Sequence, residues 1–293
     1  MNGILIVNKE KNYTSRDIVN IVGRKFNTRK VGHTGTLDPM ATGVLVICIN
    51  SATKMVELLQ ADDKEYIAEI TLGIDTDTLD ITGNIIEEKN TIISKEKVTE
   101  AIKSMKGFYE QVVPIYSAVK INGKKLYEYA RNNENIELPK RKIEIKEIEL
   151  ISDIKYINNK TIFSIRCVVS SGCYIRSLAK DIAVKLNAVG VMSSLNRVRE
   201  GIFKIEDAYT LEDIDKDNYK IIELNKDMFP YKKIIVDNDP LMFKIKNGAI
   251  VNNDYAEDIV LFIDKFGNLL ALYKKYDKDS SLLKPWKMFK GGN

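Results

Sequence analysis

Apolar runs typical of β-strands recur along the first 230 residues of the chain. Residues 4–9 begin with four apolar residues, residues 43–49 form a continuous apolar run, and residues 65–73 alternate apolar and polar positions. Continuous runs indicate strands buried on both faces, whereas alternation indicates strands with one buried face. Residues 140–172 contain at least two more strands, joined by Asn158-Asn159.

Helical periodicity separates these strands. A helix is predicted after Thr14 or Ser15, with Ile18, Ile21, Val22 and Phe26 on one face. Residues 94–107 begin with a capping Ser and end at Gly107, and residues 173–187 form an amphipathic stretch. Because strands and helices do not strictly alternate, the pattern favours an α+β fold around a mixed, mostly antiparallel sheet flanked by helices.

The pattern changes near residues 225–240, where Pro and Asn punctuate the chain. Short apolar runs and a turn at Phe266-Gly267-Asn268 follow. We therefore expect a first domain over residues 1–230 and a small all-β module over residues 231–293.

Composition narrows the class of protein. The 293 residues contain three cysteines (Cys48, Cys167 and Cys173) without metal-ligand spacing, and a single histidine, His33. These features favour reduced thiols and argue against a histidine-based metal site. No run of about 18 apolar residues and no signal peptide is evident, so we expect a cytoplasmic protein without a membrane span.

The formal net charge of +4 is small, but basic residues gather near both ends. Near the C-terminus, Lys284, Lys287 and Lys290 are interleaved with Trp286 and Phe289. Such an arrangement suits a polyanion such as nucleic acid, although ordinary solvated lysines would produce it equally well.

The segment GHTGTLDPMATG, residues 32–43, concentrates three glycines, His33 and one acid, Asp38. Pro39 disfavours the helical conformation for Asp38, so the loop presents this carboxylate in an extended pose. The carboxylate could be a nucleophile, a general base, a metal ligand or a turn cap. The metal alternative is weak because no second ligand has suitable spacing, whereas acids elsewhere leave a two-carboxylate glycosidase open.

Five segments together resemble the TruB family of bacterial tRNA pseudouridine synthases. They are GHTGTLDPMATGVLVI, KEYIAEITLG, PIYSAVKINGKKLYEYAR, SSGCYIRSLAKDIA and SSLNRVREGIF, in the family's order over roughly residues 3–210. The resemblance implies a pseudouridine-synthase fold that converts uridine 55 in the T loop of tRNA to pseudouridine. The C-terminal module resembles a PUA-type RNA-binding domain more loosely.

The resemblance assigns three catalytic residues. Asp38 matches the nucleophile, Tyr66 the tyrosine that stacks on uracil and helps to remove the C5 proton, and Arg176 the arginine that pairs with the nucleophile. Such an arginine lowers the pKa of a carboxyl group, while burial raises it.

Other residues are implied in substrate binding. Tyr174 and Leu195 match residues that line the pocket of the flipped base, and His33 matches the histidine that supports base flipping. Lys9 and Asp80 match further active-site positions whose roles are less defined.

The resemblance implies tRNA as partner, no metal or organic cofactor, and a monomer without an obligate protein partner. An insertion over about 107–140 would hold tRNA phosphates through Lys120, Lys124, Lys125, Arg131, Lys140 and Arg141. Glu10, Asn12 and Cys173 depart from the family pattern. Two rival hypotheses remain open: a non-catalytic protein that remodels RNA, and a synthase that acts on another uridine.

Overall fold

The computed structural model describes residues 2–60 and 63–289, and a large mixed sheet organises most of them. The main path of the sheet has the order β1-β3-β13-β4-β12-β10-β7, with β2, β11 and β14 paired beside it. Its strands are β1 (Gly3–Lys9), β2 (Val31–His33), β3 (Thr42–Ile49), β4 (Lys64–Leu72), β7 (Gly107–Val112), β10 (Lys140–Leu150), β11 (Lys155–Ile157), β12 (Lys160–Val169), β13 (Gly190–Glu200) and β14 (Phe203–Lys204). In this sheet only β3 and β13 run parallel among the described residues. The prediction of a mostly antiparallel sheet is thus confirmed.

The position of β3 between two hydrophobic clusters explains why its sequence is continuously apolar. Leu45, Ile47 and Ile49 point into the main hydrophobic cluster on one face of the sheet. Val44 and Val46 point into a second cluster on the opposite face. A strand covered on both sides has no solvent-facing positions, so polar alternation is lost.

The main cluster receives side chains from helices α1 (Ser15–Lys25), α3 (Lys95–Lys103) and α5 (Ile175–Lys185). Thr14 caps α1, with its side chain accepting a hydrogen bond from the Asp17 backbone N–H. α3 ends at Lys103, before the Gly107 stop expected from the sequence, because Gly107 already begins β7. α5 begins at Ile175 because Tyr174 has extended backbone angles.

Smaller elements connect these parts. They are η1 (Asn50–Met55), α2 (Val56–Leu59), β5 (Ile74–Thr76), β6 (Ile85–Glu88), β8 (Lys120–Ile121), β9 (Lys124–Lys125), α4 (Leu126–Arg131), η2 (Ile205–Asp207), α6 (Leu211–Asp215) and η3 (Lys226–Met228). The expected insertion over 107–140 thus contains β7, the β8–β9 hairpin and α4. No helix in the described ranges is long and apolar enough to cross a membrane.

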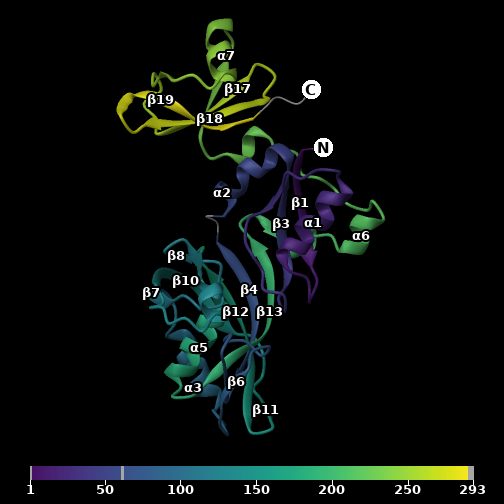
Figure 1. The fold of residues 1–293 in the computed structure, drawn as a ribbon, viewed down its shortest axis with the longest axis vertical. Coiled ribbons are helices and arrows are strands. Elements are labelled where there is room, and N and C mark those ends of the chain that lie inside the picture. The colour runs from purple at the N-terminus through teal and green to yellow at the C-terminus, as the bar shows by residue number, and fades with distance from the viewer. Residues whose placement is uncertain (1, 61–62, 290–293) are drawn as a thin grey trace.

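The C-terminal module forms a separate sheet of order β15-β17-β18-β19-β16 at one end of the molecule (Figure 1). Its strands are β15 (Lys232–Val236), β16 (Val251–Asn252), β17 (Ile259–Asp264), β18 (Leu269–Tyr276) and β19 (Asp279–Met288). The module also contains helix α7 (Asp239–Lys246), so the prediction of an all-β module was incomplete. Asn238 caps this helix, with Pro240 in its first turn, a start signal that the strand pattern around it concealed. Residues 290–293 of the expected module, including Lys290, lie outside the described residues.

A shared hydrophobic cluster joins the module to the larger part. Phe229 and Phe289 meet edge to face with ring centroids 5.5 Å apart. They pack with Met55 from the larger part and with Leu261 and Leu272 from the module. The prediction of a domain boundary at residue 230 therefore falls beside a buried contact and not in an exposed linker.

Candidate active site

The loop between β2 and β3 holds Asp38 in place through contacts on both sides of it. The Ser15 hydroxyl accepts a hydrogen bond from the Leu37 N–H at 2.8 Å and donates one to the Leu37 carbonyl at 3.2 Å. The Ala41 N–H closes a turn onto the Asp38 carbonyl at 3.0 Å. Leu37 and Met40 are buried in the main hydrophobic cluster, so the polar Asp38 side chain between them is directed elsewhere.

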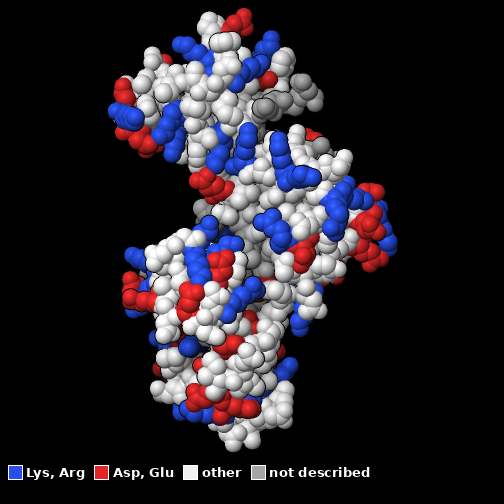
Figure 2. Space-filling model, viewed as in Figure 1, with Lys and Arg blue, Asp and Glu red and all other residues white. Residues whose placement is uncertain are grey.

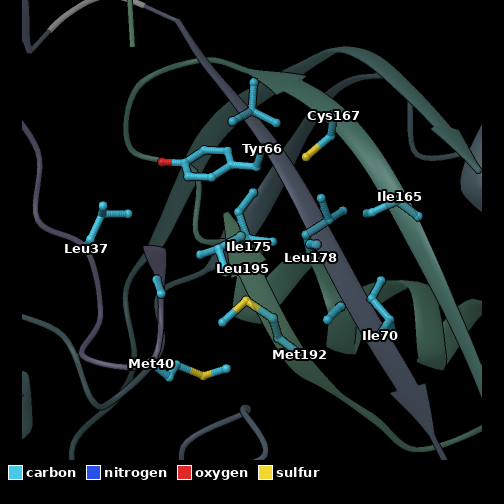
Figure 3. Close-up of a cluster of buried hydrophobic side chains, with 14 of the residues drawn as sticks. Leu37, Met40, Tyr66, Ile70, Ile165, Cys167, Ile175, Leu178, Met192 and Leu195 are labelled. Atoms are coloured by element: carbon cyan, nitrogen blue, oxygen red, sulfur yellow. The ribbon is translucent and has the colours of Figure 1, made fainter. Parts of the chain in front are cut away.

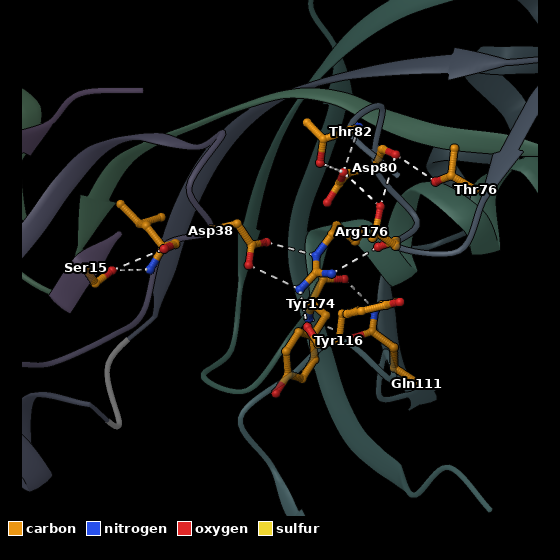
Figure 4. A network of polar contacts seen from close by, with 11 residues as sticks. Ser15, Asp38, Thr76, Asp80, Thr82, Gln111, Tyr116, Tyr174 and Arg176 are labelled. Carbon is orange, nitrogen blue, oxygen red and sulfur yellow. Dashed lines mark hydrogen bonds and ion pairs between the residues drawn. The ribbon is translucent and has the colours of Figure 1, made fainter. Parts of the chain in front are cut away.

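Arg176, the second residue of α5, binds the Asp38 carboxylate through two nitrogen atoms (Figure 4). Nε lies 2.9 Å from Oδ2, and Nη2 donates to Oδ1 at 3.2 Å. Such a bidentate pair fixes the orientation of the carboxylate as well as its charge. The guanidinium is held in orientation by hydrogen bonds that it donates to the backbone carbonyls of Thr78 and Tyr116, each at 3.0 Å.

The electrostatics of Asp38 combine two opposed effects. Burial raises the pKa of the Asp38 carboxyl above its ordinary range, and the Arg176 guanidinium counteracts this. The arginine therefore acts in the expected direction, but burial is the larger effect. The Asp38 side chain still keeps 32% of its surface exposed, so it is accessible from outside.

Lys9 and Asp80 both influence the Asp38 carboxyl through their charges. Lys9 is fully buried, and its ammonium donates to the carbonyls of Glu10, Tyr13 and Pro39. Burial lowers the pKa of Lys9 to about 8, although Asp38 opposes the shift. Lys9 thus ties the N-terminal segment to the residue after Asp38.

Asp80 organises the turn after β5. It accepts hydrogen bonds from the Thr82 N–H at 2.9 Å and from the Thr78 hydroxyl at 3.0 Å. Within the described chain it forms no ion pair with Arg176, but its charge contributes to raising the pKa of Asp38. Its carboxylate holds the turn that presents the Thr78 carbonyl to Arg176 (Figure 4).

Tyr66 and Leu195 come from neighbouring strands of the central sheet. Both belong to the cluster that also contains Leu37 and Ile175, which precede Asp38 and Arg176 in the chain (Figure 3). Each is only 6% exposed. Burial raises the pKa of Tyr66 to about 12, so its phenol is neutral near pH 7.

Tyr174 and His33 occupy the ends of secondary-structure elements. Tyr174 precedes α5, and its backbone is held by Gln111, whose Oε1 accepts from the Tyr174 N–H at 2.8 Å. His33 ends β2, and its Nδ1 is buried without a partner within the described residues. Burial and the nearby Arg16 lower the pKa of His33, so the imidazole is neutral near pH 7.

The structure therefore brings Asp38, Arg176, Lys9 and the turn of Asp80 into one network, with Tyr66 and Leu195 in the adjoining apolar cluster. Gln111 and the two carbonyls that bind Arg176 were not among the residues expected from the sequence. Backbone carbonyls have no sequence signature, and Gln111 is recognisable only from its contact with Tyr174. No group of three or more His, Cys, Asp or Glu side chains suited to a metal ion occurs among the described residues.

Comparison with known proteins identifies the family of this chain. Residues 23–175 match the family described as "TruB family pseudouridylate synthase (N terminal domain)". The tRNA pseudouridine synthase B of Staphylococcus aureus strain MSSA476 is 40% identical over 303 aligned residues, covering 98% of this chain and 99% of the relative. The protein of the same name from strain Newman has the same identity and coverage.

Solved structures show the same fold. The archaeal box H/ACA sRNP Nop10-Cbf5 complex contains a chain with a TM-score of 0.68 and 22% identity, covering 99% of this chain and 86% of that chain. A chain of a Cbf5-Nop10-Gar1 complex has a TM-score of 0.67 and 24% identity, covering 99% and 85%. The α+β fold expected from the sequence is confirmed, and the protein belongs to the TruB family of pseudouridylate synthases.

Proposed function

We propose that this protein converts uridine to pseudouridine at position 55, in the T loop of tRNA. The observation that carries the proposal is the bidentate pairing of the partly exposed Asp38 with the buried Arg176. The relatives from Staphylococcus aureus named tRNA pseudouridine synthase B support tRNA as the substrate. The T-loop position is inferred from the motifs that the chain shares with the family.

The reaction rearranges bonds within one nucleotide. The C–N glycosidic bond breaks, a C–C bond forms between the same sugar carbon and C5 of uracil, C5 loses a proton and N1 gains one. Asp38 is the nucleophile, and Arg176 orients its carboxylate. Tyr66 stacks on the base and takes part in removing the C5 proton.

The target base must leave its stack before it reaches Asp38. A new aromatic contact with Tyr66 offsets part of this cost, since base–aromatic stacking contributes roughly 1–3 kcal/mol. Tyr174 and Leu195 line the pocket around the base, and neutral His33 supports the flipped conformation.

Basic surfaces on both parts of the molecule suit an RNA backbone. Figure 2 shows Lys and Arg side chains over the larger part and over the C-terminal module. A groove of about 570 Å³ between α1 and the following loop is lined by Arg16, Arg24 and Arg29. None of these three arginines forms an ion pair within the described chain, so they are available to bind phosphates.

The test compares wild type with Asp38→Asn on an unmodified tRNA transcript, with pseudouridine mapped by chemical probing. We expect modification at position 55 with wild type and none with the variant, while both bind tRNA. Equal modification by both would remove Asp38 from catalysis. Tight binding without modification by either would favour RNA remodelling, and modification elsewhere would change the target.

A further inference from the structure

Arg197 is one of the largest side chains that the fold buries completely, with 1% of its surface exposed. It lies on β13, between the strand that follows the Asp38 loop and the strand that bears Tyr66. In the sheet register, Arg197 is paired with Gly43 of β3 on one side and with Tyr66 of β4 on the other. Its backbone thus touches both halves of the active site.

The Arg197 side chain connects the two ends of the Asp38 loop. Nη2 donates to the carbonyl of Gly35 at 2.9 Å, and Nε donates to the carbonyl of Val44 at 2.7 Å. Gly35 precedes Asp38 by three residues and Val44 follows it by six. The planar guanidinium of Arg197 therefore sets the distance between Gly35 and Val44, which lie on either side of Asp38 in the chain.

Two of the loop's three glycines lie against residue 197. A Cβ atom on Gly35 would lie 3.0 Å from Arg197 Nη1, and one on Gly43 would lie 2.2 Å from the Arg197 carbonyl oxygen. Gly43 also has φ +102°, which other residues rarely adopt. Gly35 thus leaves room for the Arg197 guanidinium, whereas Gly43 leaves room for the backbone of β13.

Glu200 contacts both Arg197 and the start of the Asp38 loop. Its Oε2 lies 3.2 Å from Arg197 Nη2, and its Oε1 accepts a hydrogen bond from the Thr34 hydroxyl at 2.8 Å. Both charged side chains are 1% exposed. A buried ion pair adds little to stability compared with apolar packing, so its presence beside a reactive loop suggests a positioning role.

Tyr66 is the neighbour of Arg197 on β4. The two residues are paired in the sheet register, so their side chains leave the sheet on the same face. The Arg197 charge opposes the rise in the pKa of Tyr66 that burial causes. Figure 3 shows the hydroxyl end of Tyr66 directed to the side of the cluster where Leu37 lies. A cation near Tyr66 stabilises negative charge that develops when the phenol loses its proton.

We propose that Arg197 is a positioning residue that fixes the Asp38 loop and the Tyr66 hydroxyl in one geometry. The inference rests on the proposed function, because it concerns the same reaction. A displacement of about 1 Å in a reacting group can cost about 100-fold in rate. Arg197 sets the position of Asp38 relative to the Tyr66 hydroxyl.

The test is Arg197→Lys, assayed under single-turnover conditions with saturating tRNA. Lysine keeps the positive charge beside Glu200 but lacks the planar fork that contacts Gly35, Val44 and Glu200 together. We expect the rate constant to fall about 100-fold, with the tRNA Kd and the reactive fraction of enzyme little changed. Arg199→Lys is the matched control, because Arg199 lies on the same strand and pairs with Glu65 instead.

A purely structural role predicts a different result. It would lower the melting temperature and the reactive fraction, while each folded enzyme kept the wild-type rate constant. That result would overturn the inference. If Arg197→Lys does not fold, Thr34→Val decides in its place, because it removes only the bond from the loop to Glu200. A lower rate constant in Thr34→Val supports the inference, and an unchanged one overturns it.

A double-mutant cycle with Tyr66→Phe tests whether Arg197 acts on the Tyr66 hydroxyl. The effect of Arg197→Lys should be smaller in the Tyr66→Phe background, since part of it acts through the missing hydroxyl. Equal effects in both backgrounds would remove Tyr66 from the inference. An inactive wild type would overturn the proposed function and this inference with it. An active wild type with an equally active Arg197→Lys overturns the inference alone.

Discussion

Arg176 and Asp38 stand 138 positions apart in the chain, yet they form a bidentate ion pair at 2.9 and 3.2 Å. The pair joins the start of helix α5 to the loop between β2 and β3. Only the assembled sheet brings these segments together, so the orientation of the Asp38 carboxylate depends on the whole fold.

Arg176→Lys should reduce the rate of pseudouridine formation about 100-fold with little loss of tRNA affinity, because lysine cannot bind both carboxylate oxygens in one plane. Single-turnover assays and tRNA binding measure the two quantities. Arg166→Lys is the matched control, since Arg166 pairs with Glu65 and Glu147 away from Asp38. Equal rates for both variants would argue against the role of the bidentate pair.

The lowered pKa of Lys9 predicts that the stability of the protein depends on pH. Its pKa is about 8 in the folded protein, below its ordinary value of 10.5. Between these values the unfolded chain binds more protons, so the free energy of unfolding contributed by Lys9 rises with pH.

Urea unfolding of wild type and Lys9→Met at about pH 8 and about pH 10 isolates this contribution. The stability of wild type relative to the variant should increase at the higher pH, because other groups titrate alike in both proteins. A difference that is constant or declines with pH would contradict the assignment.

Phe229 should be a main support of the contact between the two parts. Phe229 is 1% exposed, so Phe229→Ala removes a buried ring and leaves a cavity. We expect a loss of about 3–5 kcal/mol in the free energy of unfolding. Phe243→Ala on α7 is the control, because Phe243 is 72% exposed and should cost less than about 0.5 kcal/mol. Urea unfolding curves compare them, and similar losses would show that the shared cluster is not what stabilises the contact.

Lys140 and Arg141 should bind phosphates of the tRNA. Both are exposed at the start of β10 and form no ion pair within the described chain. Replacing both by Ala should raise the tRNA Kd and reduce the slope of log K against log salt by about 1.4–1.8.

Replacing Lys95 and Lys216 by Ala removes the same charge from lysines that pair with Asp153 and Glu212. This control should leave the salt slope unchanged. A slope that falls equally in both double variants would show that overall charge, and not this surface, governs binding.

Local features of the site could be predicted because they depend on neighbouring residues. Pro39 restricts Asp38, Thr14 caps α1, and the unbroken apolar run of β3 indicates burial on both faces. Each of these effects acts over a few positions, so periodicity and capping patterns reveal it. The shared motifs then predict roles for Asp38, Tyr66 and Arg176.

Other features required the tertiary structure. α7 was missed because short apolar runs on both sides of it favoured strands, and the end of α3 was misplaced because Gly107 begins a strand. The carbonyls of Thr78 and Tyr116 bind Arg176 without any sequence signal, since every residue carries a carbonyl.

Neighbouring residues were enough to show that Asp38 stands in a restrained loop and which elements surround it. The pairing of Arg176 with this carboxylate, and the bonds from Arg197 to both ends of the loop, emerged only from the folded chain. Strand register and helix packing set the distances between residues far apart in the chain, and these distances depend on the whole core rather than on local propensity.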